Sequence, residues 1–393
     1  MRKLIPTICV FLLLVGAVHG TLGPDSKKKT GKKEKKKTGD SSLLPAGDAD
    51  RFVPDGDTRK KLNEGYGEFS TEERKFTSGA SLAYVTPWNN HGYDVAKKAA
   101  QKFTHISPVW FQFSESPTGD TTCEITGTHD VDHQWVTAVR EANPNIKIVP
   151  RFIFHEFSKD FQKFLTSEQY SHRCGQAIVD YILRNGFDGA VIEIWFQVIM
   201  SSQGRGGPFV LEIVENWATL FHRVGLEIIV PLTAPLLDET KPIGIATPQQ
   251  IQSLVRVIDY LSIMTYDYNS ETPAGIGPLP WVEANLRYLL NLVGHQNAHK
   301  LLLGTNMYGY MYQPKPAPGL IRDFDGLIKD ENLRFDWDKI AAEHAIREKT
   351  GNIRAYLPSE RSIEARLELA RKYGVGFAIW EVGQGYNFYF DPL

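Results

Sequence analysis

Short runs of β-branched and aromatic residues alternate with longer amphipathic segments from residue 78 to the end of the chain. Runs with a period of two predict strands, and apolar positions spaced three and four apart predict helices. The predicted strands are residues 80–86, 105–113, 146–154, 189–195, 226–233, 260–266, 300–307 and 376–381. The predicted helices are residues 95–103, 133–142, 167–183, 209–224, 248–257, 281–294, 337–349 and 359–373. Strands that alternate with helices indicate an α/β protein with a parallel sheet.

Eight strand–helix repeats within residues 78–393 predict one (β/α)8 TIM barrel, a fold for which about 250 residues is typical. Residues 311–355 are more than one loop requires, so we expect a small insertion between strand 7 and the last helix. A doubly wound open sheet is the alternative. It is less favoured because Thr86-Pro87-Trp88 follows the first strand, where such a sheet would carry a glycine-rich phosphate-binding turn.

The first 20 residues have the pattern of a secretory signal peptide. Arg2 and Lys3 precede an apolar run over residues 4–18, and Ala17 and Gly20 are small residues suited to a cleavage site. No later run approaches the roughly 18 apolar residues of a membrane span. We therefore expect a secreted product without a membrane span, with a signal anchor as the alternative.

Residues 21–77 are predicted to form a basic, largely disordered N-terminal segment. The run from Lys27 to Lys37 reads KKKTGKKEKKK, eight Lys against one Glu, in a chain whose formal net charge is −2. A block of like charges without apolar residues cannot form a core. We expect a solvated linker here, with a contact to heparin-like polyanions as the alternative. The rest of the chain is acidic, so no nucleic-acid binding is expected of it.

The cysteines and histidines add little chemistry. Cys9 lies in the predicted signal peptide, so Cys123 and Cys174 are left, and they either form one disulfide or stay reduced. His129 and His133 lie four apart, but this spacing fits the start of a helix better than a metal site. No phosphate-binding loop or serine-nucleophile motif occurs, and no metal or cofactor is expected.

The predicted strand at residues 189–195 carries a single carboxylate, Glu193. With the residues before it, the strand resembles the fourth-strand pattern of glycoside hydrolase family 18, the chitinases. That pattern is Asp-Gly-x-Asp-x-Asp-x-Glu, and its last Glu is the proton donor. Asp188 and Gly189 match it, whereas Val191, Glu193 and Trp195 replace the three acids. Because an indole N–H is not an acid near neutral pH, the resemblance implies that this chain lacks hydrolase activity.

Later strands extend the resemblance over most of the predicted barrel. Met264, Tyr266 and Asp267 match the sixth-strand motif Met-x-Tyr-Asp, Tyr308 lies within the match to the seventh strand at residues 303–309, and Trp380 ends the match to the eighth. Residues 356–373 are similar to the helix before the eighth strand in a chitinase-like branch that includes bacterial spore and cell-wall proteins. The resemblance is nearest to the secreted, stabilin-interacting members of the family.

A saccharide-binding groove is predicted at the carboxyl ends of the strands, which form the functional face of such barrels. Aromatic rings can stack on sugars, and carboxylate and amide groups can bind sugar hydroxyls. Met264 is included as a residue of the sixth-strand motif. The predicted site consists of Trp88, Trp195, Tyr266, Tyr308, Trp380, Asp267, Asn269, Met264 and Glu193.

Two of these residues have alternative roles. Alternate residues of a strand share a face, so Val191, Glu193 and Trp195 should all point into the barrel, with Glu193 about 6.6 Å deeper than Trp195. Trp195 then either stacks on the sugar or blocks the groove. Glu193 forms a polar floor beneath the sugar or shares a proton with Asp267.

The function expected from the resemblance is that of a non-hydrolytic lectin. Its ligands would be chito-oligosaccharides or related amino-sugar glycans, including bacterial glycans in innate immunity. An active glycosidase of altered specificity is one alternative, and a scaffold that binds an endocytic scavenger receptor, a stabilin, is another. Secretion is the expected localisation, with delivery to late endosomes or lysosomes.

Overall fold

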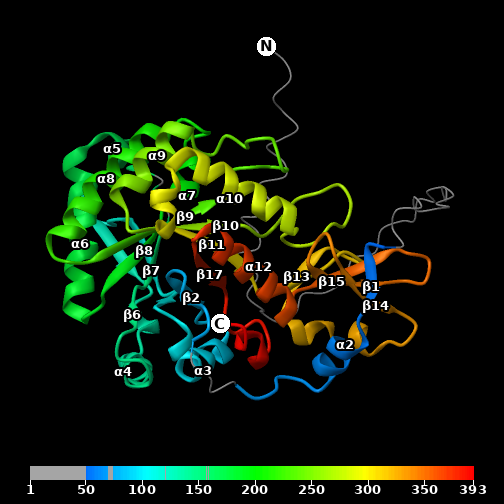
Figure 1. The fold of residues 1–393 in the computed structure, drawn as a ribbon. Helices are drawn as coiled ribbons and strands as arrows, with labels where there is room; N and C mark the ends of the chain where they lie inside the picture. Colours follow the sequence, from blue (N-terminus) through cyan, green and yellow to red (C-terminus); the bar gives the residue numbers. More distant parts are fainter. Residues whose placement is uncertain (1–49, 70–73, 120, 156, 158) are drawn as a thin grey trace, which may run out of the picture. The chain divides into compact units, whose positions relative to one another are not determined.

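The computed structural model describes residues 50–69, 74–119, 121–155, 157 and 159–393. A curled, mainly parallel sheet lies at the centre of this part of the chain (Figure 1). Its strands are β2 (Ser81–Val85), β3 (His105–Pro108), β4 (Phe111–Glu115), β5 (Cys123–Thr126), β6 (Lys147–Ile148), β7 (Arg151–Phe154), β8 (Gly189–Glu193), β9 (Glu227–Thr233), β10 (Tyr260–Met264), β11 (Leu301–Asn306) and β17 (Gly376–Trp380). Within the described residues their order is β5-β4-β7-β8-β9-β10-β11-β17-β2-β3-β6.

The sheet closes into a barrel through two strands that are each broken in the middle. The predicted strand 105–113 is present as β3 and β4, and the predicted strand 146–154 as β6 and β7. Strand β3 pairs in parallel with β6, and β4 with β7. Pro108 and Pro150 lie at the two breaks, where a proline has no amide hydrogen for the ladder. Counting each broken strand once, the predicted (β/α)8 TIM barrel is confirmed.

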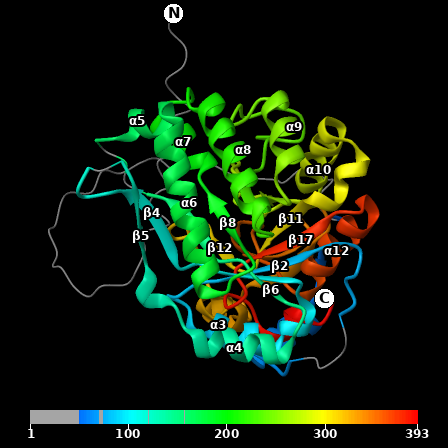
Figure 2. The same ribbon diagram turned by 90° about the vertical axis from the view of Figure 1, so that its left-hand side faces the viewer.

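Amphipathic helices cover the outside of the barrel (Figure 2). They are α3 (Asn90–Lys98), α4 (His133–Ala142), α5 (Phe161–Thr166), α6 (Glu168–Asn185), α7 (Trp195–Ser201), α8 (Gly207–Arg223), α9 (Pro248–Val257), α10 (Leu279–Val293) and α12 (Glu360–Tyr373). Short 3-10 helices lie at Ala100–Lys102, Thr128–Asp130, His295–Lys300, Ile321–Phe324 and Asn387–Phe390. None of the described helices is long and apolar enough to cross a membrane.

The predicted insertion after strand 7 is a second sheet. Its strands are β12 (Gly309–Met311), β13 (Ala317–Gly319), β14 (Arg334–Asp338), β15 (Glu343–Arg347) and β16 (Ile353–Leu357). The short helix α11 (Asp325–Lys329) lies in the same insertion, between β13 and β14 in the chain. The helix predicted at residues 337–349 was therefore wrong, because β14 and β15 pair there as antiparallel strands. All five residues of β15 are buried, so the sequence lacks the polar–apolar alternation that marks a half-exposed strand.

The folded part begins before residue 78, which corrects the boundary predicted from sequence. Strand β1 (Phe52–Pro54) pairs with β14, and α2 (Gly56–Asn63) follows it beside this second sheet (Figure 1). Arg51 fixes this start because its Nε and Nη2 donate to the carboxylate of Asp338 at 2.9 and 2.7 Å. The predicted signal peptide at residues 1–20 and the basic run at residues 27–37 lie outside the described residues.

A disulfide joins Cys123 and Cys174, whose Cα atoms are 4.9 Å apart. It connects the antiparallel strand β5 to α6, and so fastens the hairpin at one end of the sheet to the helical layer. Of the two states that the sequence left open, the structure has the bonded one.

Candidate functional site

Trp195 does not point into the barrel. Strand β8 ends at Glu193, and the backbone of Ile194 leaves the extended region (φ −122°, ψ −30°), so the alternation of faces stops before residue 195. Trp195 is the first residue of α7, is 1% exposed, and donates its indole N–H to the carbonyl of Ile245 at 3.0 Å. It packs with Ile192 and Ile194 in the outer core, the apolar layer between the strands of the barrel and the helices around it. Both roles predicted for Trp195, stacking on a sugar and blocking the groove, are therefore wrong.

Glu193 is the last residue of β8 and stands at the mouth of the barrel. Arg151 Nη1 donates to one of its carboxylate oxygens at 3.0 Å, and the amide nitrogen of Gln197 donates to the other at 3.1 Å. Among the described residues no hydrogen bond joins Glu193 to Asp267. The shared proton predicted as an alternative is thus not seen, and no Trp195 ring lies above Glu193.

Arg151 was missed in the sequence analysis, although a signal was present. Phe152 packs in the outer core and Val149 in the inner one, so Arg151 faces inward above Val149. In the ladder between β7 and β8, Arg151 is the partner of Val191. Glu193 follows Val191 by two residues and therefore lies on the same face of β8. A charged residue at an inward position beside the only carboxylate of the next strand indicates an ion pair.

Aromatic side chains gather across the mouth from Glu193. Trp380, the last residue of β17, has its ring centroid 5.2 Å from that of Tyr84 on β2. The Tyr84 hydroxyl donates to Ser262 Oγ on β10 at 3.1 Å. Trp380 packs both on the inner core of the barrel and on a cluster from the second sheet that includes Tyr308. The sequence had predicted Trp380 here, whereas Tyr84 was missed because it lies inside the strand.

Tyr266, Asp267 and Tyr308 form the polar side of the same mouth. The Tyr308 hydroxyl donates to the Asp267 carboxylate, and the rings of Tyr266 and Tyr308 meet edge to face at 6.4 Å. Asp267 is accessible to solvent, yet the protein around its carboxyl excludes enough water to raise its pKa, and the bond from Tyr308 opposes this shift. Its φ of +60° lies in the left-handed region, which Asp tolerates better than most residues and which turns the chain at this point.

Residues 80–385 match the family model for glycosyl hydrolases family 18. The chain belongs to this family. The structure is similar to that of a chitinase from Chromobacterium violaceum, with 19% identity, a TM-score of 0.66, and coverage of 80% of this chain and 97% of that one. It is also similar to the spore cortex-lytic enzyme SleL of Bacillus megaterium, with 15% identity, a TM-score of 0.62, and coverage of 82% and 74%. A family 18 chitinase from Cycas revoluta, solved in complex with (GlcNAc)3, has 13% identity, a TM-score of 0.63, and coverage of 80% and 99%. At these identities the likeness establishes the barrel fold.

The remaining predicted site residues lie around the mouth of the barrel, outside the aromatic cluster of Tyr84, Tyr266, Tyr308 and Trp380. Trp88 is 57% exposed in the loop after β2, and no ring contact between it and another described residue is seen. Asn269 is exposed in the loop after β10, and Met264 is half-buried at the end of that strand. The structure thus brings together Glu193, Tyr266, Asp267, Tyr308 and Trp380, adds Tyr84 and Arg151, and places Trp195 elsewhere.

Glu381 follows Trp380 and is 1% exposed. The side-chain amide of Asn89 donates to one of its oxygens at 2.6 Å and the backbone N–H of Gly383 to the other at 2.9 Å. Burial raises the pKa of Glu381 from 4.5 to about 7, and these two hydrogen bonds only partly oppose the shift. The carboxyl therefore ties the start of α3 to the end of β17 beside the groove.

The free energy of unfolding should fall as the pH rises from about 4.5 to about 7, because Glu381 titrates in this range. The folded protein still holds this proton at pH values where the unfolded chain has lost it, so its contribution is complete below about pH 4.5 and is lost as the pH rises through about 7. Glu381→Gln should remove this component, on the order of 1–3 kcal/mol between pH 4.5 and 8. Urea unfolding of both proteins over this pH range measures it. Parallel pH profiles would contradict the assignment.

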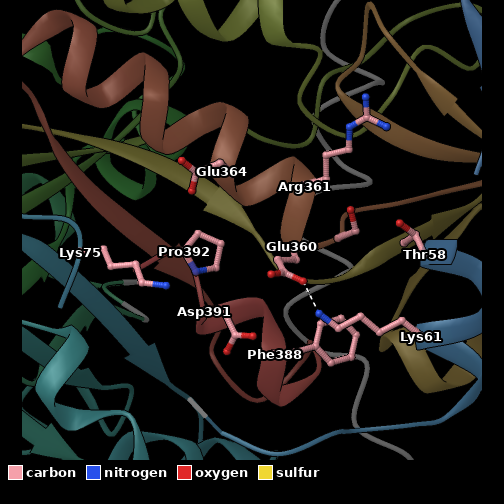
Figure 3. A pocket seen from close by; sticks show the side chains of 10 residues that line it. Thr58, Lys61, Lys75, Glu360, Arg361, Glu364, Phe388, Asp391 and Pro392 are labelled. Carbon is pink, nitrogen blue, oxygen red and sulfur yellow. Dashed lines mark hydrogen bonds and ion pairs between the residues drawn. The ribbon is translucent and has the colours of Figure 1, made fainter. Parts of the chain in front are cut away.

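A cavity of about 450 Å³ lies away from the aromatic residues of the barrel mouth, where α2, the start of α12 and the C-terminal residues meet (Figure 3). Its lining residues are Thr58, Lys61, Lys75, Ser359, Glu360, Arg361, Glu364, Phe388, Asp391 and Pro392. Lys61 forms an ion pair with Glu360 and lies 4.2 Å from the centre of the Phe388 ring. The lining of this cavity carries both acidic and basic side chains. The cavity shares no residue with the aromatic cluster formed by Tyr84, Tyr266, Tyr308 and Trp380.

Proposed function

We propose that this family 18 protein binds chito-oligosaccharides or related amino-sugar glycans in the mouth of its barrel and does not hydrolyse them. The observation that carries the proposal is the position of Trp195. It stands where the family pattern has its proton donor, yet it is buried in the helical layer, while Tyr266 and Trp380 remain partly exposed at the mouth, close to the buried rings of Tyr84 and Tyr308. The related Cycas revoluta chitinase was solved with (GlcNAc)3, which supports the ligand class.

Glu193 is the group best placed to replace the missing acid, but its partners argue against that role. A general acid must carry a proton and deliver it to an atom within about 3 Å. Arg151 and Gln197 both donate hydrogen bonds to Glu193, which suits a carboxylate that accepts and does not suit an acid that donates. These contacts favour a binding role for Glu193.

Hydrolysis with altered specificity is the second candidate, and one observation favours it. The pKa of Asp267 is raised by its surroundings, and this carboxyl opens onto the same mouth as Glu193. An acid whose pKa is raised towards the working pH is a common feature of hydrolytic sites.

Calorimetric titration with chitotetraose, run beside turnover of an aryl chitobioside, separates the two functions. We expect saturable heat with a Kd between micromolar and millimolar and a flat progress curve over hours. Turnover that disappears in Glu193→Gln or Asp267→Asn would establish the hydrolase instead. If no heat and no change of Trp fluorescence occur at millimolar sugar, the binding proposal fails.

Secretion, delivery to late endosomes or lysosomes, a role in recognising bacterial glycans and capture by a stabilin are further proposals that rest on the sequence. Pull-down with a stabilin ectodomain tests the receptor, using the full chain and a deletion of residues 27–37, each with and without competing chitotetraose. Loss of capture on deletion would indicate contact through the basic run, and loss with sugar would indicate contact through the groove.

A further inference from the structure

Arg151 has an unused pair of donors beside Glu193 at the mouth of the barrel. Its contact with Glu193 goes through Nη1 alone, at 3.0 Å. The residue is 7% exposed, and its Nε is buried without a hydrogen-bond partner among the described residues. Neither Nε nor Nη2 donates to any described residue. A buried guanidinium N–H without a partner is costly, so this edge requires an acceptor that the described part of the chain does not supply.

The unused edge is the one that grips carboxylates elsewhere in this protein. Arg51 holds Asp338 through Nε and Nη2 at 2.9 and 2.7 Å. Arg347 uses the same two nitrogens to hold a single oxygen, Oδ2, of Asp336. Two parallel N–H groups in a fixed plane match the two oxygens of a carboxylate better than they match any single acceptor.

Gln197 supplies a complementary acceptor beside the same carboxylate. Its amide nitrogen donates to Glu193 at 3.1 Å, which turns its Oε1 away from Glu193. That oxygen is buried and accepts no hydrogen bond from the residues that the structure describes. The floor around Glu193 therefore has both a free donor edge, on Arg151, and a free acceptor, on Gln197.

We propose that the groove selects amino-sugar glycans in which one sugar carries a carboxylate. This inference rests on the proposed binding function and names its ligand class more closely. The ligand carboxylate docks on the Nε–Nη2 edge of Arg151, and a neighbouring hydroxyl or amide N–H of the sugar donates to Gln197 Oε1. Glu193 keeps the guanidinium in place through Nη1. A neutral chito-oligosaccharide leaves the paired edge of Arg151 only partly satisfied and binds more weakly.

Matched disaccharides test the inference by calorimetry. The neutral probe is N,N′-diacetylchitobiose. One acidic probe is N-acetylglucosaminyl-N-acetylmuramic acid, which carries a lactyl carboxylate, and the other is a glucuronyl-N-acetylglucosamine disaccharide, which carries a ring carboxylate. We expect at least one acidic probe to bind about 10- to 100-fold tighter than the neutral one, the gain typical of charge-assisted hydrogen bonds. The probe with the advantage identifies the source of the carboxylate.

Arg151→Lys keeps the charge and removes the planar pair of donors, so the preference should fall at least tenfold while diacetylchitobiose still binds. Arg140→Lys is the matched control, because Arg140 pairs with Asp188 at 2.8 Å on the outside of the barrel. Gln197→Met provides a second variant that leaves the ion pair intact, and it should weaken the preference severalfold.

Three results would overturn the inference. If wild type binds diacetylchitobiose and the acidic probes equally, a buried water satisfies Arg151 and the proposed function stands without this selectivity. If the preference survives in Arg151→Lys, another group reads the carboxylate. If no probe binds, the proposed function fails and this inference with it.

Discussion

Arg366→Met should destabilise the protein by about 3–5 kcal/mol, the cost of leaving a buried charge without its partner. Arg366 is 1% exposed on α12 and donates through Nη2 to Glu343 at 2.8 Å and to the carbonyl of Gly277 at 2.6 Å. Burial already raises the pKa of Glu343, and the guanidinium charge is the main influence that lowers it. Without Arg366 the folded state must bury this carboxylate unpaired or bind a proton.

The effect should reach the groove. Glu343 also accepts the backbone N–H groups of Ile276 and Gly277, and Ile276 in turn accepts the N–H of Tyr268, next to Asp267. Denaturant unfolding and chitotetraose titration should therefore both report the change. Arg371→Met is the control on the same helix, because its pair with Glu364 is 35% and 40% exposed and should contribute at most about 1 kcal/mol. Equal losses in the two variants would show that the buried pair has no special weight.

Trp380→Ala should weaken chito-oligosaccharide binding about 100-fold, or about 3 kcal/mol, as expected for an aromatic anchor at the centre of a binding site. The Trp380 ring packs against Tyr84 and also contacts the cluster that contains Tyr308. It therefore connects the inner core of the barrel to the second sheet at the point where a sugar would lie.

Trp88→Ala is the comparison for this variant, because Trp88 is 57% exposed and lies outside the aromatic cluster. We expect a loss of threefold or less. Thermal unfolding of both variants separates a binding defect from a folding defect. An unchanged Kd in folded Trp380→Ala would remove Trp380 from the site and, with it, the groove as proposed.

The match to family 18 gives a fold, whereas the activity depends on individual residues. The strand-four resemblance implies that three acids are replaced in this chain, and the structure adds that the third of these positions, Trp195, does not face the mouth of the barrel. Restoring an acid at this position by Trp195→Glu would place it in the helical layer, away from any bound sugar. Under the proposed function, the proton donor is lost through a change in chain direction as well as in side chain.

Much of the barrel could be predicted because its signals are local. The strand and helix periods are each set by neighbouring residues, and the ends of parallel strands must meet at one face. These two rules are enough to assign Tyr266, Asp267, Tyr308 and Trp380 to one mouth. The same reasoning failed at Trp195, because a strand that ends two residues early reverses the expected direction of the next side chain.

Local patterns in the sequence were thus enough to predict the eight-repeat barrel and the family, and to place candidate site residues at the ends of the strands. The direction of Trp195, the pairing of Arg151 with Glu193, the second sheet and the bond between Cys123 and Cys174 became visible only in the folded chain. These features depend on contacts between residues far apart in the chain, such as Arg51 with Asp338, 287 positions away. The local pattern of a strand or helix determines the face on which a side chain lies. The residue that the side chain contacts depends on how the whole chain packs.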